Sequence, residues 1–262
     1  LQNVYTAKPG LPRGSVKALR VIQVLPKSTP GKDMPPIGIP SGAPGKQVLG
    51  TVPVEPDGSA HFIAPARREL AFQALDHRGL AVQIMRSGVY LQPGERVTCI
   101  GCHEPRDSSP PSVRPMALLR PPSRIVPGPD GTKPFSYPIL VQKLLDQRCV
   151  PCHSGPNPPK GVVLTGEPEG HYSRSYNALA HRVPFSDMGN GEAISKPGRF
   201  GARGSPLMRM LLEGHQGVQL SPQEVERLAT WMDVSVLFYG TFDTAEQARQ
   251  LRGERIACPK LE

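Results

Sequence analysis

The sequence has few aromatic residues and no long apolar run, and these two shortages exclude several classes of protein. No apolar segment approaches the roughly 18 residues that a membrane-spanning helix needs. Neither a collagen-like glycine repeat nor a heptad pattern is present, which excludes triple helices and long coiled coils. Phe, Trp and Tyr make up only 5% of the 262 residues, so we expect something other than aromatic bulk to fill part of the core.

Proline and positive charge are present in excess. The chain has 32 prolines and 27 glycines, which predicts ordered turns and long coil around an ordinary hydrophobic core. The net charge of +9 comes from scattered residues, and Arg67-Arg68 is the only adjacent pair of Lys or Arg. Because no nucleic-acid motif accompanies this charge, we expect a basic surface and no nucleic-acid partner.

Five cysteines carry the clearest functional signal. Four of them form two CxxC pairs, and each pair is followed at once by a histidine, in CIGCH (99–103) and CVPCH (149–153). Three interpretations compete. They are a zinc site with four thiolate ligands, a pair of redox dithiols, and two attachment sites for c-type haem.

The paired histidines favour haem. Histidine is only 7 of the 262 residues, and neither zinc knuckles nor redox dithiols need one after each pair. Haem c needs all three residues, because the thiols attach the macrocycle and the imidazole binds iron. The spacing between the pairs also exceeds the about 15–20 residues of zinc ribbons. We therefore predict two covalently attached c-type haems, with attachment through Cys99, Cys102, Cys149 and Cys152 and proximal iron ligation by His103 and His153.

Haem c also predicts a compartment. Bacteria attach this cofactor outside the cytoplasm, so we expect a periplasmic or extracellular protein. The chain begins at Leu1, and we expect a mature or excised product from which any export signal has been removed. Two haems would add flat apolar bulk, and their propionates would offset part of the positive charge. Cys258 is the fifth cysteine and a candidate for an intermolecular disulfide.

Residue periodicity predicts an α+β fold with much Pro-rich coil. We expect strands over 16–25, 48–54, 59–64, 69–75, 80–86 and 88–92, and helices over 137–148, 206–213 and 221–235. The last helix begins with a capping box, Ser221 to Glu224. The predicted organisation is an extended arm (1–15), a small antiparallel β-sandwich with one haem (16–104), a Pro-rich linker (105–134), a helical cytochrome c-like domain with the second haem (135–240) and an irregular tail (241–262).

Several segments resemble the hydrazine synthase alpha-subunit family. They are PVEPDGSAHF, QALDHRGLAVQIMRSGVYLQPGERVTCIGCHEPR and PSRIVPGPDGTKPFSYPILVQKLLDQRCVPCH, and the likeness extends over roughly residues 16–240. The resemblance implies the haem-bearing middle and C-terminal domains of that family, and related dihaem proteins of environmental bacteria. In the enzyme it implies an open first haem, with a tyrosine shortly after CxxCH. Residues 104–109 contain no tyrosine, which favours electron transfer.

Histidine and methionine residues outside the two motifs are candidates for the distal iron ligands. His215, in LMRMLLEGHQGVQLS, resembles the Gly-His element that the family has near its second haem. It is a candidate distal ligand there, and the alternative is a surface histidine that follows a helix. Met208 and Met210 could also bind iron. Their helical spacing beside leucines instead favours a core position.

The remaining histidines offer further candidates. His61 lies within a predicted strand and is either a distal ligand of the first haem or a cross-strand surface residue. His171 and His181 flank a Tyr-rich loop and are candidates for a haem in the same chain or a neighbouring one. His77 lies in an Asp-His-Arg-Gly turn, where we expect it to be solvated.

Two functions are consistent with the sequence. A haem with two strong axial ligands has no vacant site and passes electrons, so the first is an electron carrier. If chains assemble head to tail, such carriers form a filament and a continuous haem wire. The alternative is a catalytic dihaem enzyme, hydrazine synthase-like or peroxidase-like, with one open haem. The sequence favours the carrier, with redox proteins or copies of itself as partners.

Overall fold

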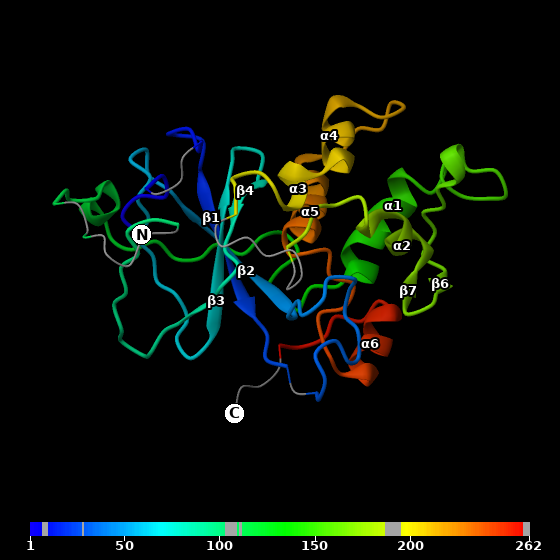
Figure 1. Ribbon diagram of the computed structural model, residues 1–262, viewed down its shortest axis with the longest axis horizontal. Coiled ribbons are helices and arrows are strands. Elements are labelled where there is room, and N and C mark those ends of the chain that lie inside the picture. The colour runs from blue at the N-terminus through cyan, green and yellow to red at the C-terminus, as the bar shows by residue number, and fades with distance from the viewer. Residues whose placement is uncertain (7–9, 28, 103–108, 110–111, 187–194, 259–262) are drawn as a thin grey trace. The chain divides into compact units, whose positions relative to one another are not determined.

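The structure is a computed structural model, and its described part divides into two compact units (Figure 1). The described residues are 1–6, 10–27, 29–102, 109, 112–186 and 195–258. Unit 1 comprises Leu1–Val24, Val48–Thr132 and Glu192–Arg199, and unit 2 comprises Leu25–Gln47, Lys133–Gly191 and Phe200–Glu262. The first CxxC pair lies in unit 1 and the second in unit 2. No helix among the described residues is long and apolar enough to cross a membrane.

Unit 1 is built around one sheet. Its strands are β1 (Ala18–Val24), β2 (Lys46–Pro53), β3 (Glu69–Leu75), β4 (Ala81–Ile84) and β5 (Val89–Tyr90). The order is β2-β1-β3-β4, and β5 also pairs with β3. β1 and β3 run antiparallel, from Ala18 opposite Leu75 to Gln23 opposite Leu70. Because side chains alternate between faces and β1 is buried over five consecutive residues, both faces of this central strand are covered.

The predicted β-sandwich was wrong, because the described part of unit 1 holds a single sheet. The run 59–64 forms only a one-residue bridge, between Phe62 and Ser123. Within the same run, Ala60 pairs with Leu1. The backbone nitrogen of each residue donates to the carbonyl of the other at 3.0 Å. The described part of the predicted arm is therefore packed into unit 1, where Val4 is fully buried.

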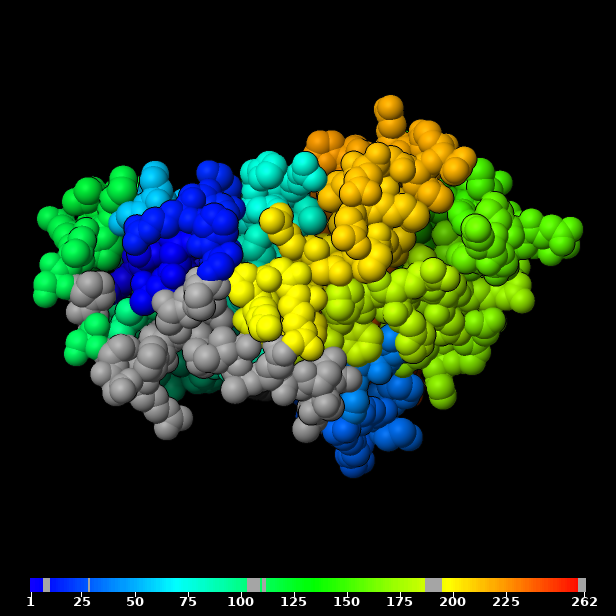
Figure 2. Space-filling model, turned by 45° about the horizontal axis from the view of Figure 1, so that its top comes forward, coloured from blue at the N-terminus to red at the C-terminus, as the bar shows by residue number. Residues whose placement is uncertain are grey.

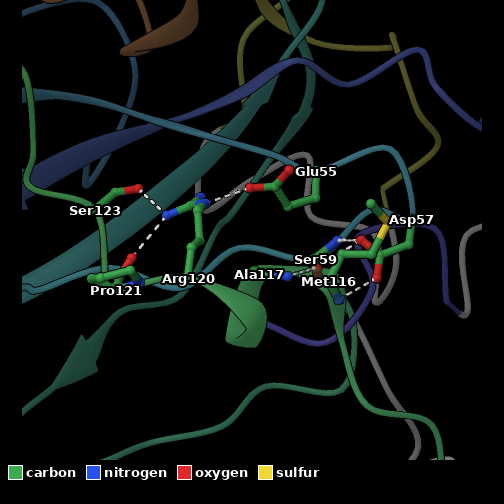
Figure 3. Close-up of polar contacts among 8 residues, drawn as sticks. All are labelled: Glu55, Asp57, Ser59, Met116, Ala117, Arg120, Pro121 and Ser123. Carbon is green, nitrogen blue, oxygen red and sulfur yellow. Dashed lines mark hydrogen bonds and ion pairs between the residues drawn. The ribbon is translucent and has the colours of Figure 1, made fainter.

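Residues predicted to form a linker are anchored to the loop at 55–59 (Figure 3). The carboxylate of Asp57 accepts from the backbone nitrogen of Met116 at 2.8 Å, at the start of η1 (Met116–Leu119). Arg120 follows and pairs with Glu55, with 2.6 Å between Nε and Oε1. Desolvation raises the pKa of Asp57, but the hydrogen bonds from Met116 and Ser59 outweigh it and lower the pKa. Residues 112–132 therefore belong to unit 1.

Unit 2 is mainly helical. Its elements are the π-helical turn η2 (Pro138–Gln142), α1 (Lys143–Arg148), η3 (Pro159–Gly161), β6 (Pro168–Glu169), β7 (Tyr172–Ser173), α2 (Arg174–Ala180), α3 (Gly201–Gly204), α4 (Pro206–Glu213), α5 (Pro222–Asp233) and α6 (Thr244–Leu251). The three predicted helices are confirmed, and so is the capping box of α5. The prediction of an irregular tail was wrong. Asp243 caps α6 by accepting from the Glu246 nitrogen at 3.0 Å, a signal that the Asp-x-x-Glu spacing already carried.

Aromatic rings form the core of unit 2. Tyr137 lies 5.1 Å from Trp231 and 5.4 Å from Phe238 between ring centroids, and Tyr176 lies 4.9 Å from Phe238. The buried hydroxyls are satisfied, since Tyr137 donates to Ser175 Oγ and Tyr176 donates to the Val236 carbonyl. Burial raises the pKa of both tyrosines, which keeps them neutral. The few aromatic residues are thus concentrated where unit 2 needs bulk.

A half-buried lysine contacts the C-terminus of α5. Lys46 Nζ donates to the carbonyl of Val234 at 3.0 Å. Burial lowers the pKa of Lys46 from its usual 10.5 to about 8. The chain beyond Val234 is strained, because Ser235 and Val236 have φ angles of 67° and 45°. A cation at this helix end is favourable and offsets part of the cost of burying it.

This lysine makes the stability of unit 2 depend on pH. The folded pKa lies below the unfolded one, so the native state binds the proton less tightly, and the charged amine destabilises it below about pH 8. We expect Lys46→Met to raise the free energy of unfolding by about 2 kcal/mol at pH 7. The gain should shrink as pH rises from about 8 to 10.5, because the folded-state amine is then already neutral while the unfolded-state amine loses its proton as well.

Urea unfolding followed by the fluorescence of Trp231, the single tryptophan, measures this in unit 2. The exposed Lys143→Met is the matched control and should change stability little at either pH. A gain from Lys46→Met that is equal at pH 7 and pH 10.5 would contradict the titration.

Candidate haem sites

The second CxxCH motif follows directly from α1. The nitrogens of Cys149 and Val150 donate to the Leu145 carbonyl at 2.8 and 2.9 Å. The chain then turns tightly, and the nitrogens of Cys152 and His153 donate to the Cys149 carbonyl at 3.1 and 2.9 Å. This turn holds both thiols and the imidazole on one short loop, as covalent haem attachment requires.

The thiol environment of this motif does not fit a redox dithiol. Burial raises the pKa of Cys149 to about 11, with smaller contributions from Cys152 and Glu224. Such a thiol stays protonated at neutral pH and is a weak nucleophile, whereas catalytic dithiols have lowered pKa values. The zinc interpretation gains no support either. Among the residues that the structure describes, no group of three or more His, Cys, Asp or Glu is placed to hold a metal ion.

The His153 ring is oriented by a backbone acceptor. Its Nδ1 lies 3.0 Å from the carbonyl oxygen of Val162, and Leu164 nitrogen donates to the His153 carbonyl at 2.8 Å. Since a carbonyl only accepts, Nδ1 carries the proton, and Nε2 of the neutral ring keeps its lone pair. A histidine that binds a metal through one ring nitrogen usually donates a hydrogen bond from the other, as Nδ1 does here to Val162. No sequence signal pointed to Val162, because a backbone acceptor can be any residue.

A tight turn presents His215. α4 ends at Gly214, which has a φ of 107°. His215 and Val218 then form a one-residue bridge, with the Val218 nitrogen 2.9 Å from the His215 carbonyl. The two residues between them, Gln216 and Gly217, have φ angles of 49° and 75°, as a type I′ turn requires. In Figure 2 the orange segment after α4 lies on the surface beside the green segment after α1.

These two turns bring His153 and His215 together. Their ring centroids are 6.1 Å apart and their planes are inclined by 22°. Two parallel rings stacked in van der Waals contact have atoms about 3.5–4 Å apart, and their centroids would lie closer together than those of His153 and His215. Two imidazoles on opposite sides of one metal ion have centroids about 6 Å apart, from two metal–nitrogen bonds of about 2 Å and two ring radii of about 1.1 Å. The spacing of this pair therefore fits a haem iron.

The first CxxCH motif lies in unit 1, and His103 falls outside the described residues. The N-terminal segment lies along the motif, since the Gln2 nitrogen donates to the Cys99 carbonyl at 2.8 Å. Cys102 is half-buried and packs against the hydrophobic core of unit 1. The N-terminal segment therefore connects the motif to Ala60, with which Leu1 pairs on its other side.

His61 follows Ala60 and has an unsatisfied ring nitrogen. Its Nδ1 is buried and has no hydrogen-bond partner among the described residues. Its backbone carbonyl accepts from the Ser123 nitrogen at 2.9 Å, which fixes this part of the chain. Burying an unpaired polar group costs about 1–3 kcal/mol, so Nδ1 is expected to bind a water molecule, a ligand or a metal ion. A buried nitrogen of this kind fits a metal ligand.

The other candidates are not brought to either motif by any observed contact. His77, His171 and His181 are exposed, and Met208 is fully buried in the core of unit 2. His171 lies 6.4 Å from Tyr172 between ring centroids. Cys258 is half-buried, at the end of the described chain.

Comparison with known proteins relates the chain to one family. Residues 14–104 match the family model of the hydrazine synthase alpha subunit middle domain. The chain is related to this family through that segment. No curated protein sequence matches it. The fold resembles the structure titled Kuenenia stuttgartiensis Hydrazine Synthase, with a TM-score of 0.69 and 19% identity over 91% of this chain and 42% of that one. The chain thus spans about two fifths of the length of that structure.

The left-handed residues of the turn at His215 predict how substitutions there change thermal stability. Gly217→Ala places a Cβ at a φ of 75°, where nothing lies within 4 Å, so the cost is backbone strain alone. We expect a loss of about 1 kcal/mol, seen as a drop of a few degrees in the thermal midpoint. Gln216→Gly at the preceding left-handed position should raise the midpoint or leave it unchanged. A larger loss from Gln216→Gly than from Gly217→Ala would contradict this account of the turn.

Proposed function

We propose that the chain is a dihaem c-type cytochrome that transfers electrons outside the cytoplasm. In unit 2, Cys149 and Cys152 would attach the haem, and His153 and His215 would bind its iron. The observation that carries this proposal is the 6.1 Å spacing of the two rings. When bound, the haem supplies one-electron oxidation and reduction at its iron.

The residues of unit 2 suit an electron carrier. Two strong nitrogen ligands, His153 and His215, would leave no vacancy for a substrate at the iron. The Val162 carbonyl fixes the tautomer of His153 and increases the electron donation of its Nε2. Because backbone elements hold both rings, little rearrangement accompanies a change of charge, which favours rapid electron transfer.

In unit 1 we propose a second haem on Cys99 and Cys102, with His103 as the proximal ligand and His61 as the distal one. The buried, unsatisfied Nδ1 of His61 supports this assignment. His171 and His181 remain weaker candidates for a haem in the same chain or a neighbouring one. Redox proteins and further copies of the chain are the proposed partners, and Cys258 is the proposed site of a disulfide between copies. Periplasmic or extracellular localisation follows from the site of haem c attachment.

A catalytic role is the second candidate. It is favoured by the family match, because residues 14–104 include both cysteines of the first motif. In that case the first haem would keep an open position for a small substrate, and the haem of unit 2 would exchange electrons with it. The state of His61 separates the two functions, since a bound His61 closes the first site.

Absorption spectra of the reduced protein with and without carbon monoxide test the proposal. We expect two haems per chain and no spectral change with carbon monoxide, because all axial positions are filled. His215→Ala should make about half of the Soret absorption respond, and a Cys149→Ser/Cys152→Ser variant should lose one of the two haems. His77→Ala, exposed in its turn, is the matched control and should behave as wild type. A response in the wild-type protein that increases in His215→Ala would place the open iron in unit 1 and favour the enzyme.

A further inference from the structure

One ion pair joins the two segments that carry His153 and His215. Arg148, the residue before Cys149, places Nε 2.8 Å from Oε1 of Glu224 and Nη2 3.4 Å from Oε2. Both carboxylate oxygens thus face the guanidinium, which is the strong arrangement for this pair. The Glu224 side chain is only 11% exposed, whereas the Arg148 side chain is 46% exposed, so water and salt reach the pair from the arginine side.

Glu224 also caps α5. Its Oε2 accepts from the Ser221 nitrogen at 2.7 Å, and Ser221 Oγ accepts from the Glu224 nitrogen at 3.3 Å. His215 lies upstream in the same connection between α4 and α5. The contact with Arg148 therefore fastens the end of α1, which leads into the CxxCH loop, to the connection that presents His215.

Both partners are charged at neutral pH. The hydrogen bond from Arg148 lowers the pKa of Glu224, and Glu224 raises the pKa of Arg148. The two imidazole rings do not hold each other, because 6.1 Å separates their centroids. Their spacing depends on the backbone segments that carry them, and the ion pair joins these segments.

We propose that Glu224 is a positioning residue for His215, and that its ion pair with Arg148 keeps the His215 segment at ligand distance from the His153 loop. This inference rests on the proposed haem coordination. Glutamine at position 224 keeps the size of the side chain and an acceptor for the Ser221 nitrogen, but it gives up the charge that binds Arg148. The connection that carries His215 then moves away more often, and the distal position opens.

The rate of carbon monoxide binding to the reduced protein measures this opening, because the gas enters only when His215 has left. We expect Glu224→Gln to raise the rate about tenfold at unchanged haem content, as fits the loss of one charge-assisted hydrogen bond. Arg148→Gln should give a similar increase, and the double variant no more than either single one. Ser221→Ala is the matched control. It removes a cap bond and leaves the ion pair, so its rate should stay within about twofold of wild type.

The possible results separate this inference from the coordination on which it rests. Unchanged rates in Glu224→Gln and Arg148→Gln, with rapid binding in His215→Ala, overturn the positioning role alone. Wild-type binding that His215→Ala does not alter overturns the coordination itself. An equal acceleration in Ser221→Ala would assign the effect to the helix cap and refute the ion pair. If Glu224→Gln does not fold, Arg148→Gln decides, because the Arg148 side chain is 46% exposed and lies outside the cap.

Discussion

The distance between the imidazoles of His153 and His215 is the constraint on which the candidate site of unit 2 depends. Each ring sits on its own turn, and neither turn can set a separation of 6.1 Å alone. The Val162 carbonyl orients one ring, and two left-handed residues, Gln216 and Gly217, shape the turn that presents the other. Ligands fixed in this way are held by their supporting shell before any metal binds, which is the condition for a well-defined coordination geometry.

The aromatic core joins the helical segments that carry the two histidine turns of unit 2. Tyr137 begins the helical segment that leads into the CxxCH loop, and its ring packs 5.1 Å from that of Trp231 in α5. The N-terminal end of α5 holds Glu224, which contacts Arg148 at the far end of the same segment. The two helices are therefore joined twice, once by rings and once by charge. A sequence with 5% aromatic residues places several of its rings at this junction.

Local signals in the sequence predicted local structure well. The predicted ranges for β3 and α4 match the observed ones, and the capping box of α5 is present with both of its hydrogen bonds. Each depends on residues within a few positions of one another. The prediction of a sandwich failed because the run at 59–64 pairs with Leu1 and Ser123. Periodicity within a segment does not indicate which distant residues it pairs with.

The same limit applies to the site. CxxCH is a local motif, so the candidate attachment residues could be named from spacing alone, and haem attachment there stays a prediction. The approach of His215 to His153 is a product of the tertiary fold, and only the family resemblance pointed to it. The Asp-x-x-Glu cap of α6 was a local signal that went unused, whereas the contact between Arg148 and Glu224 had no signal in sequence.

The family likeness and the best-formed site lie in different units, and this separation bears on function. The family match covers residues 14–104, yet the paired imidazoles are in unit 2. Our proposal of electron transfer therefore rests on the geometry of unit 2 and does not depend on unit 1. In unit 1 the deciding atom is Nδ1 of His61, whose burial without a partner is unfavourable by about 1–3 kcal/mol. If iron is the partner that relieves this cost, the first site is closed and both units carry electrons. If another group relieves it, the first iron stays open and the carrier unit serves a reaction.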